Sequence, residues 1–109
     1  MSTLLQSYKR PEMTDGDAAP AYFHNGIPYT SAGAIAVKNL GVIDHYHQGL
    51  PFTDVGRLVV AFNGVTDRFN GGAAPFDTSN FLVITSGATT NFSGGVPYDA
   101  TGRVAITLV

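Results

Sequence analysis

The chain has 109 residues, enough for one domain with a modest core but too few for a multidomain enzyme. Its net charge of −2 and its scattered Lys and Arg residues are against a nucleic-acid-binding surface. Cysteine is absent, which excludes disulfides and thiolate zinc sites, and no segment approaches the roughly 18 apolar residues of a membrane-spanning helix.

Residues 1–21 differ in kind from the rest, because they mix charged side chains with Pro and small residues. We expect either a frayed terminus or an extended N-terminal arm that orders on a neighbouring protein. The apolar side chains available for such contacts are those of Leu4, Leu5, Tyr8 and Met13.

Residues 22–109 contain one unit of about 23 residues four times. Phe23, Tyr46, Phe69 and Phe92 are spaced by 23 residues, and so are Gly26, Gly49, Gly72 and Gly95. A proline follows each glycine, and the third copy has one extra residue, Ala73 or Ala74. Such a period indicates a fold built from repeated supersecondary units, and we expect each unit to be a β-hairpin.

Each unit contains a turn that begins with Asp or Thr and has Gly or Asn at its fourth position. The four turns are Thr30–Gly33, Thr53–Gly56, Asp77–Asn80 and Asp99–Gly102. A short polar side chain favours the first position of a type I turn, and Gly or Asn tolerates the left-handed conformation that follows it. We therefore predict positive φ at Gly33, Gly56, Asn80 and Gly102.

The segments after these turns alternate with period 2, as in Leu58, Val60 and Phe62, and neither strand face is strongly polar. Helical periodicity is missing. The sequence predicts an all-β domain over residues 22–109, with about eight short strands in four repeated hairpins, arranged as a sandwich or barrel. With only 13% charged residues, such strands are expected inside a sandwich or at a subunit contact.

Two sets of aromatic residues recur at equivalent positions in the repeats. The first set is Phe23, Tyr46, Phe69 and Phe92, and the second is Tyr29, Phe52, Phe76 and Tyr98. We expect both to pack in the core and between repeats. The alternative is that their rings stack on sugars.

Candidate catalytic and metal-binding residues are few. His45 and His47 have the H-x-H spacing that two metal ligands use, but a third ligand with suitable spacing is not visible. Asp44 beside His45 suggests an acid–base pair, although neighbouring strand residues are expected to face opposite ways. We therefore expect no enzymatic activity, no metal and no cofactor.

The repeated pattern G-[ILV]-P-[FY]-x-x-x-G-x-[ILV]-x-[VI] occurs at Gly26–Val37, Gly49–Val60 and Gly95–Ile106. It resembles a pattern common in small virion structural proteins of tailed bacteriophages. The third copy departs from it at Ala74 and Asn80.

This resemblance implies a virion location, on the capsid or tail surface, as a capsid decoration or cement protein that stabilises the shell through protein–protein contacts. The implied partner is the major capsid protein or a neighbouring virion protein, without nucleic acid or membrane. A homo-oligomer is expected, preferably a trimer, because phage appendages of this type commonly have threefold symmetry. The alternatives are a head or tail fibre module that binds host-surface carbohydrate and, from Asp44 and His45 alone, a small hydrolase or isomerase.

Overall fold

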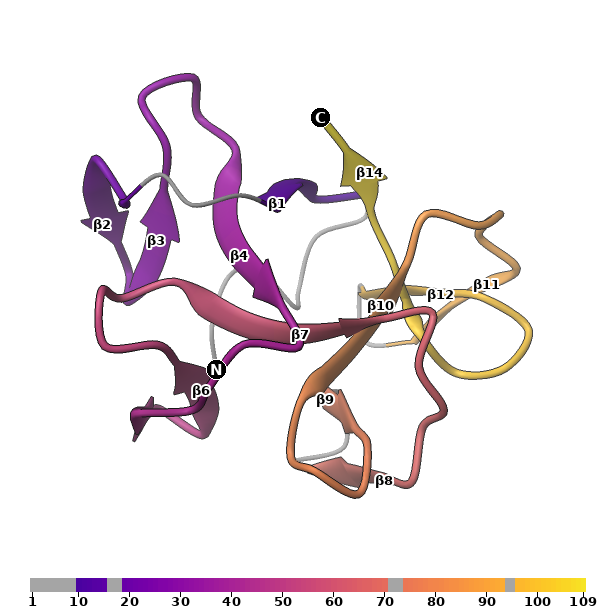
Figure 1. The fold of residues 1–109 in the computed structure, drawn as a ribbon. Helices are drawn as coiled ribbons and strands as arrows, with labels where there is room; N and C mark the ends of the chain where they lie inside the picture. The colour runs from indigo at the N-terminus through magenta and orange to yellow at the C-terminus, as the bar shows by residue number, and fades with distance from the viewer. Residues whose placement is uncertain (1–9, 16–18, 71–73, 94–95) are drawn as a thin grey trace.

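The computed structural model describes residues 10–15, 19–70, 74–93 and 96–109, and this part of the chain is all β (Figure 1). Its strands join in one sheet. They are β1 (Glu12–Asp15), β2 (Tyr22–His24), β3 (Ile27–Tyr29), β4 (Ile35–Asn39), β5 (His45–His47), β6 (Leu50–Phe52), β7 (Leu58–Phe62), β8 (Arg68–Asn70), β9 (Ala74–Phe76), β10 (Leu82–Thr85), β11 (Asn91–Ser93), β12 (Val96–Tyr98), β13 (Val104–Ala105) and β14 (Thr107–Leu108). The all-β prediction is confirmed.

The prediction of about eight strands is wrong, because each repeat contributes three strands. In the first repeat β2 and β3 pair antiparallel around Asn25 and Gly26, whose φ angles are 53° and 81°. In the second repeat Gln48 and Gly49 have φ angles of 53° and 82° between β5 and β6. Two successive positive φ values define a type I′ turn, the tightest common hairpin connection. Each repeat therefore has a small hairpin before the predicted turn.

The predicted second turn of each repeat is confirmed. Gly33, Gly56, Asn80 and Gly102 have φ angles of 88°, 92°, 69° and 86°. In every repeat the amide at this position donates to the carbonyl of the first turn residue, as Gly56 N does to Thr53 O at 3.0 Å. The Asp or Thr side chain also accepts from the backbone, since Asp77 Oδ1 lies 2.9 Å from the amides of Ser79 and Phe81.

The third strands of the repeats pair parallel with one another around a ring. β4 pairs with β1 and β7, and β10 pairs with β7 and β13. β14, which follows β13 after the single residue Ile106, pairs parallel with β1 and closes the ring. The small hairpins lie around this central set of strands (Figure 1). The result is a solenoid-like arrangement in which each repeat adds one central strand.

Successive central strands are displaced by two residues relative to the repeat. Val37 pairs with Leu58 rather than with its repeat equivalent Val60, and Val60 pairs with Leu82 rather than with Ile84. An even displacement keeps equivalent side chains on the same face of the sheet, because side chains alternate with period 2. A constant stagger of this kind tilts the strands, as closure of a sheet requires.

One hydrophobic cluster takes residues from every central strand and from the inner strand of every hairpin. It contains Met13, Ile27, Ile35, Val37, Leu50, Phe52, Leu58, Val60, Ala74, Phe76, Leu82, Ile84, Val96, Tyr98, Val104 and Ile106. The alternate residues Ala36, Val59, Ala61, Val83 and Ala105 are also buried. Both strand faces are therefore covered within a single chain, which accounts for part of the low charge without any subunit contact.

Part of the predicted N-terminal arm, residues 1–21, belongs to the folded domain. Glu12–Asp15 forms β1 in the ring, and Met13 is fully buried in the core cluster. Arg10 donates from Nη2 to the carbonyl oxygens of Ser86, at 2.8 Å, and of Ile106. Met13 is thus a core residue and not a partner contact. Sequence reasoning missed this because the segment contains no copy of the repeat pattern, while its burial depends on strands from both ends of the chain.

Candidate binding pockets between repeats

The two aromatic sets have different environments. Phe52, Phe76 and Tyr98 are buried and Tyr29 is half-buried, which confirms core packing for the second set. In the first set Phe23 and Tyr46 are 58% and 54% exposed, and Phe69 and Phe92 are each 49% exposed. For these four residues the expectation of core packing is wrong, but packing between repeats is confirmed for Phe23 and Phe69, which contact Gly56 and Tyr98 of the next repeat. They lie on the outer strands β2, β5, β8 and β11, whose described side chains are exposed.

Three pockets lie at equivalent places between consecutive repeats. In each, the exposed aromatic residue of one repeat faces the hairpin and second turn of the next. The first pocket is lined by Phe23, Gly26, His45, His47, Phe52 and Gly56. The second is lined by Tyr46, Gly49, Arg68, Phe76 and Asn80. The third is lined by Phe69, Asn91, Ser93, Tyr98, Asp99, Ala100 and Gly102.

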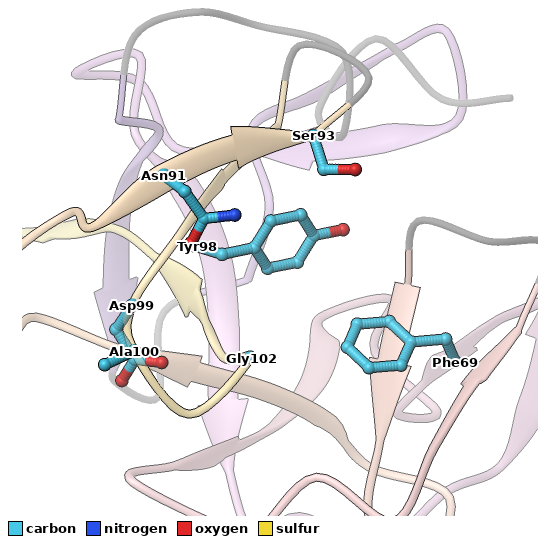
Figure 2. A pocket seen from close by; sticks show the side chains of 7 residues that line it. All are labelled: Phe69, Asn91, Ser93, Tyr98, Asp99, Ala100 and Gly102. Carbon is cyan, nitrogen blue, oxygen red and sulfur yellow. The ribbon is translucent and has the colours of Figure 1, made fainter.

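The third pocket has a volume of about 380 Å³, larger than the other two, and polar side chains in its lining. Asn91 and Ser93 project from β11 on the same side as the Tyr98 ring, and the Phe69 ring points toward them from the preceding repeat (Figure 2). The centroids of the Phe69 and Tyr98 rings are 6.0 Å apart, with 72° between the planes, an edge-to-face contact. Burial raises the pKa of the Tyr98 hydroxyl above its ordinary value of 10.0.

Hydrogen bonds to Asp99 hold the turn that borders this pocket. Its Oδ1 accepts from the amides of Thr101 and Arg103, both at 2.9 Å, and its Oδ2 accepts from Arg103 Nε at 2.8 Å. Burial by itself would raise the pKa of Asp99, but the bonds from Arg103 and Thr101 lower it below its ordinary value of 3.8. At neutral pH the carboxylate is charged and engaged in the turn.

Arg68 lines the second pocket. Its guanidinium carbon lies 5.7 Å from the centroid of the Phe76 ring, a cation–π arrangement. It also donates to Asp77 O at 3.2 Å and to Asn80 Oδ1. The remaining volume is about 220 Å³.

Two histidines cover the aromatic floor of the first pocket. His45 stacks on Phe52 with centroids 5.8 Å apart, and His47 is tilted against the same ring at 6.4 Å. This pocket has a volume of about 270 Å³. His45 and His47 lie on the same face of β5, because both rings contact Phe52.

The geometry expected for Asp44 and His45 is wrong. Their side chains meet, with Asp44 Oδ2 2.9 Å from His45 Nδ1, because Asp44 precedes β5 and does not follow strand alternation. Both side chains are more than half exposed, so water screens the pair. Within the described residues, no three His, Asp or Glu side chains gather closely enough to hold a metal ion.

The sequence-predicted turn residues fall partly into the pockets. Gly56, Asn80 and Gly102 each line one pocket, whereas Gly33 lines none of the three. Leu4, Leu5 and Tyr8 lie outside the described residues. Sequence reasoning found the exposed aromatic set and the turns separately. It missed that the aromatic residue of one repeat contacts the turn of the next, because that depends on the order of strands around the ring.

Comparison with protein families, with curated proteins and with solved structures found no match. The described part of the chain contains no helix that is long and apolar enough to cross a membrane.

Proposed function

We propose that this chain is a non-enzymatic structural protein of a bacteriophage virion that decorates or cements the capsid through protein–protein contacts. The observation that supports this most directly is the exposure of large apolar side chains at repeat-equivalent positions. The first aromatic set is about half exposed, and the loop residues Val42 and Val65, one repeat apart, are 84% and 82% exposed. Apolar groups displayed in a regular pattern favour a partner surface.

The proposed partner is the major capsid protein or a neighbouring virion protein, and the proposed assembly is a homo-oligomer, preferably a trimer. Only 13% of the residues are charged, so few charged groups would have to lose water when copies of the chain associate. A stable interface needs about 800 Å² from each partner. The exposed loops and aromatic rings, together with Leu4, Leu5 and Tyr8, are the candidate contributors to that area.

The test is binding to virions that assemble without this protein. Val42→Asp with Val65→Asp should lower shell occupancy, because the added charges would have to be desolvated in the interface. Ser31→Asp, which adds one negative charge at an exposed turn residue where the double variant adds two, is the control and should bind normally. Equal occupancy by all three proteins would contradict the proposed contact surface.

Leu4, Leu5 and Tyr8 require a separate deletion. Removing residues 1–21 would also remove Met13 from the core, so any loss of binding would be uninterpretable. Removing residues 1–9 keeps β1 intact. Full occupancy by this shorter chain would exclude an attachment role for the three residues.

A second candidate function is a head or tail fibre module that binds host-surface carbohydrate. The three pockets favour it, because each places an exposed aromatic ring beside polar groups in a concave site. This function is compatible with a virion location, and a glycan array distinguishes it from pure decoration.

A further inference from the structure

The three inter-repeat pockets differ in volume and in the residue at one position of the repeat. Arg68, His45 and Asn91 are structural equivalents, each paired across its hairpin with the second-set aromatic residue Phe76, Phe52 or Tyr98. The pocket volume is about 220 Å³ with arginine, 270 Å³ with histidine and 380 Å³ with asparagine. Volume rises as this side chain becomes smaller, and we call this position the gate.

In two of the three pockets the side chain at this position covers the second-set aromatic ring. Arg68 lies over Phe76, and His45 stacks on Phe52, so an intramolecular group already covers these rings. In the third pocket the Phe69 ring contacts Tyr98 edge to face, and the short Asn91 side chain lies beside them without covering the half-exposed Phe69 ring (Figure 2). The three pockets share one architecture, but only the third combines the smallest gate residue with the largest volume.

We infer that the third inter-repeat pocket binds a neutral pyranose ring, an inference that rests on the carbohydrate-binding candidate above. A pyranose has an apolar C–H face and an edge of hydroxyl groups. The C–H face suits the exposed Phe69 ring, while Asn91 and Ser93 supply an amide and a hydroxyl for hydrogen bonds.

The charge at the pocket restricts the sugar class. The Asp99 carboxylate borders the site and its pKa is lowered by the bonds that hold the turn, while Arg103 is directed to that carboxylate. An acidic sugar would place a second carboxylate near Asp99 without a cation of its own, which is unfavourable. The pocket therefore selects neutral hexoses and N-acetylhexosamines over uronic and sialic acids.

Exchanging the gate residues tests the inference on the full chain. The probes are the methyl glycosides of glucose, galactose, mannose and N-acetylglucosamine, with methyl glucuronide as the acidic control, titrated to tens of millimolar while amide resonances are followed by NMR. We expect saturable shifts at Asn91, Ser93 and Gly102 with at least one neutral glycoside. Asn91→Arg should abolish them, because the arginine at this position in the second pocket lies over the aromatic ring and accompanies the smallest volume of the three.

The reverse exchange provides a gain of binding that misfolding cannot imitate. Arg68→Asn should open the second pocket and produce new saturable shifts at Tyr46 and Asn80. Phe69→Ala should weaken binding in the third pocket by about threefold to tenfold through loss of ring contact. If Asn91→Arg does not fold, the Arg68→Asn titration decides. The absence of new saturable shifts in Arg68→Asn would show that the gate residue does not control binding.

The outcomes separate the inference from the function on which it rests. Saturable shifts that lie elsewhere, or that persist in Asn91→Arg, would overturn the third-pocket site while leaving carbohydrate binding in place. Stronger binding of methyl glucuronide than of the neutral glycosides would overturn the charge argument. No saturable shift with any glycoside would overturn both the site and the carbohydrate-binding candidate.

Discussion

The ring of Phe23 lies directly against Gly56, although the two residues belong to different repeats. A Cβ atom at position 56 would lie 2.9 Å from Phe23 Cζ, closer than real Cβ contacts allow. Gly102 has the same relation to Phe69, at 3.2 Å. The glycine of the second turn thus has two roles. It adopts a left-handed conformation, and it provides space for the aromatic ring of the preceding repeat.

Gly33 separates these two roles, because its φ of 88° is close to the 92° of Gly56 but a Cβ there would meet nothing within 4 Å. We predict that Gly33→Ala lowers the free energy of unfolding by about 1 kcal/mol, the cost of the left-handed conformation alone. Gly56→Ala should cost more, since Phe23 must also move, and Gly56→Val more again. Chemical denaturation of each variant measures these differences.

A double-mutant cycle identifies the contact responsible. Adding Phe23→Ala should recover the excess cost of Gly56→Ala over Gly33→Ala, because the clashing ring is gone. If Gly33→Ala and Gly56→Ala are equally destabilising, the packing role of Gly56 is wrong and only its backbone role remains.

Asp99 is predicted to make stability depend on acid pH. Its folded-state pKa is lowered, so its contribution is present above the ordinary pKa of 3.8 and is lost as the pH falls through the lower folded-state value. At neutral pH Asp99→Asn should reduce the free energy of unfolding by about 1 to 3 kcal/mol, because charge-assisted bonds to Thr101 and Arg103 are weakened.

Denaturation as a function of pH measures this effect. The difference between the natural chain and Asp99→Asn should shrink as the pH falls below about 4, near the ordinary value for a carboxyl group. Asp54→Asn, at an exposed position in the equivalent turn of the second repeat, serves as the control. A stability difference that does not change with pH would show that Asp99 acts through something other than its charge.

Met13 provides the sharpest test of ring closure. It pairs with Ile35 on one side and with Leu108 on the other, and its side chain is fully buried. Met13→Ala should therefore cost about 2 to 5 kcal/mol, the usual range for a cavity in a core, whereas Met13→Leu should cost less than about 1.5 kcal/mol. A small effect of Met13→Ala would mean that β1 is not part of the stable ring.

The features predicted from the sequence are those that a few adjacent residues determine. The type I turns and the positive φ of Asn80 follow from local sterics and from the Asp77 side chain, so the sequence predicts them correctly. The Asn25-Gly26 pair is also a strong local signal for a type I′ turn, but the predicted repeat has only one turn and does not include this one. That error accounts for the missing strands.

Features that depend on distant segments were not predictable in the same way. Parallel pairing such as Val37 with Leu58 leaves no turn motif, and its register depends on which side chains become buried together. The role of Met13 depends on both Ile35 and Leu108, which are far apart in the sequence. The pockets follow from this ring order, so the sequence indicated their components but not their assembly.

The final prediction concerns self-association. Val42 and Val65 are exposed on two equivalent loops, and burying such side chains between copies contributes about 25 cal/mol for each Å² of apolar area removed from water. We expect the natural chain to associate at micromolar concentration, with a trimer as the preferred species, and Val42→Asp with Val65→Asp to shift it toward monomer. Sedimentation velocity measures the distribution, and Ser31→Asp should leave it unchanged. Because surface substitutions away from structural features usually alter stability by no more than about 0.5 kcal/mol, thermal unfolding of the dissociated variant should remain cooperative. If the natural chain sediments as a monomer at micromolar concentration, the homo-oligomer is wrong, and the exposed valines are then candidates only for contact with a different protein.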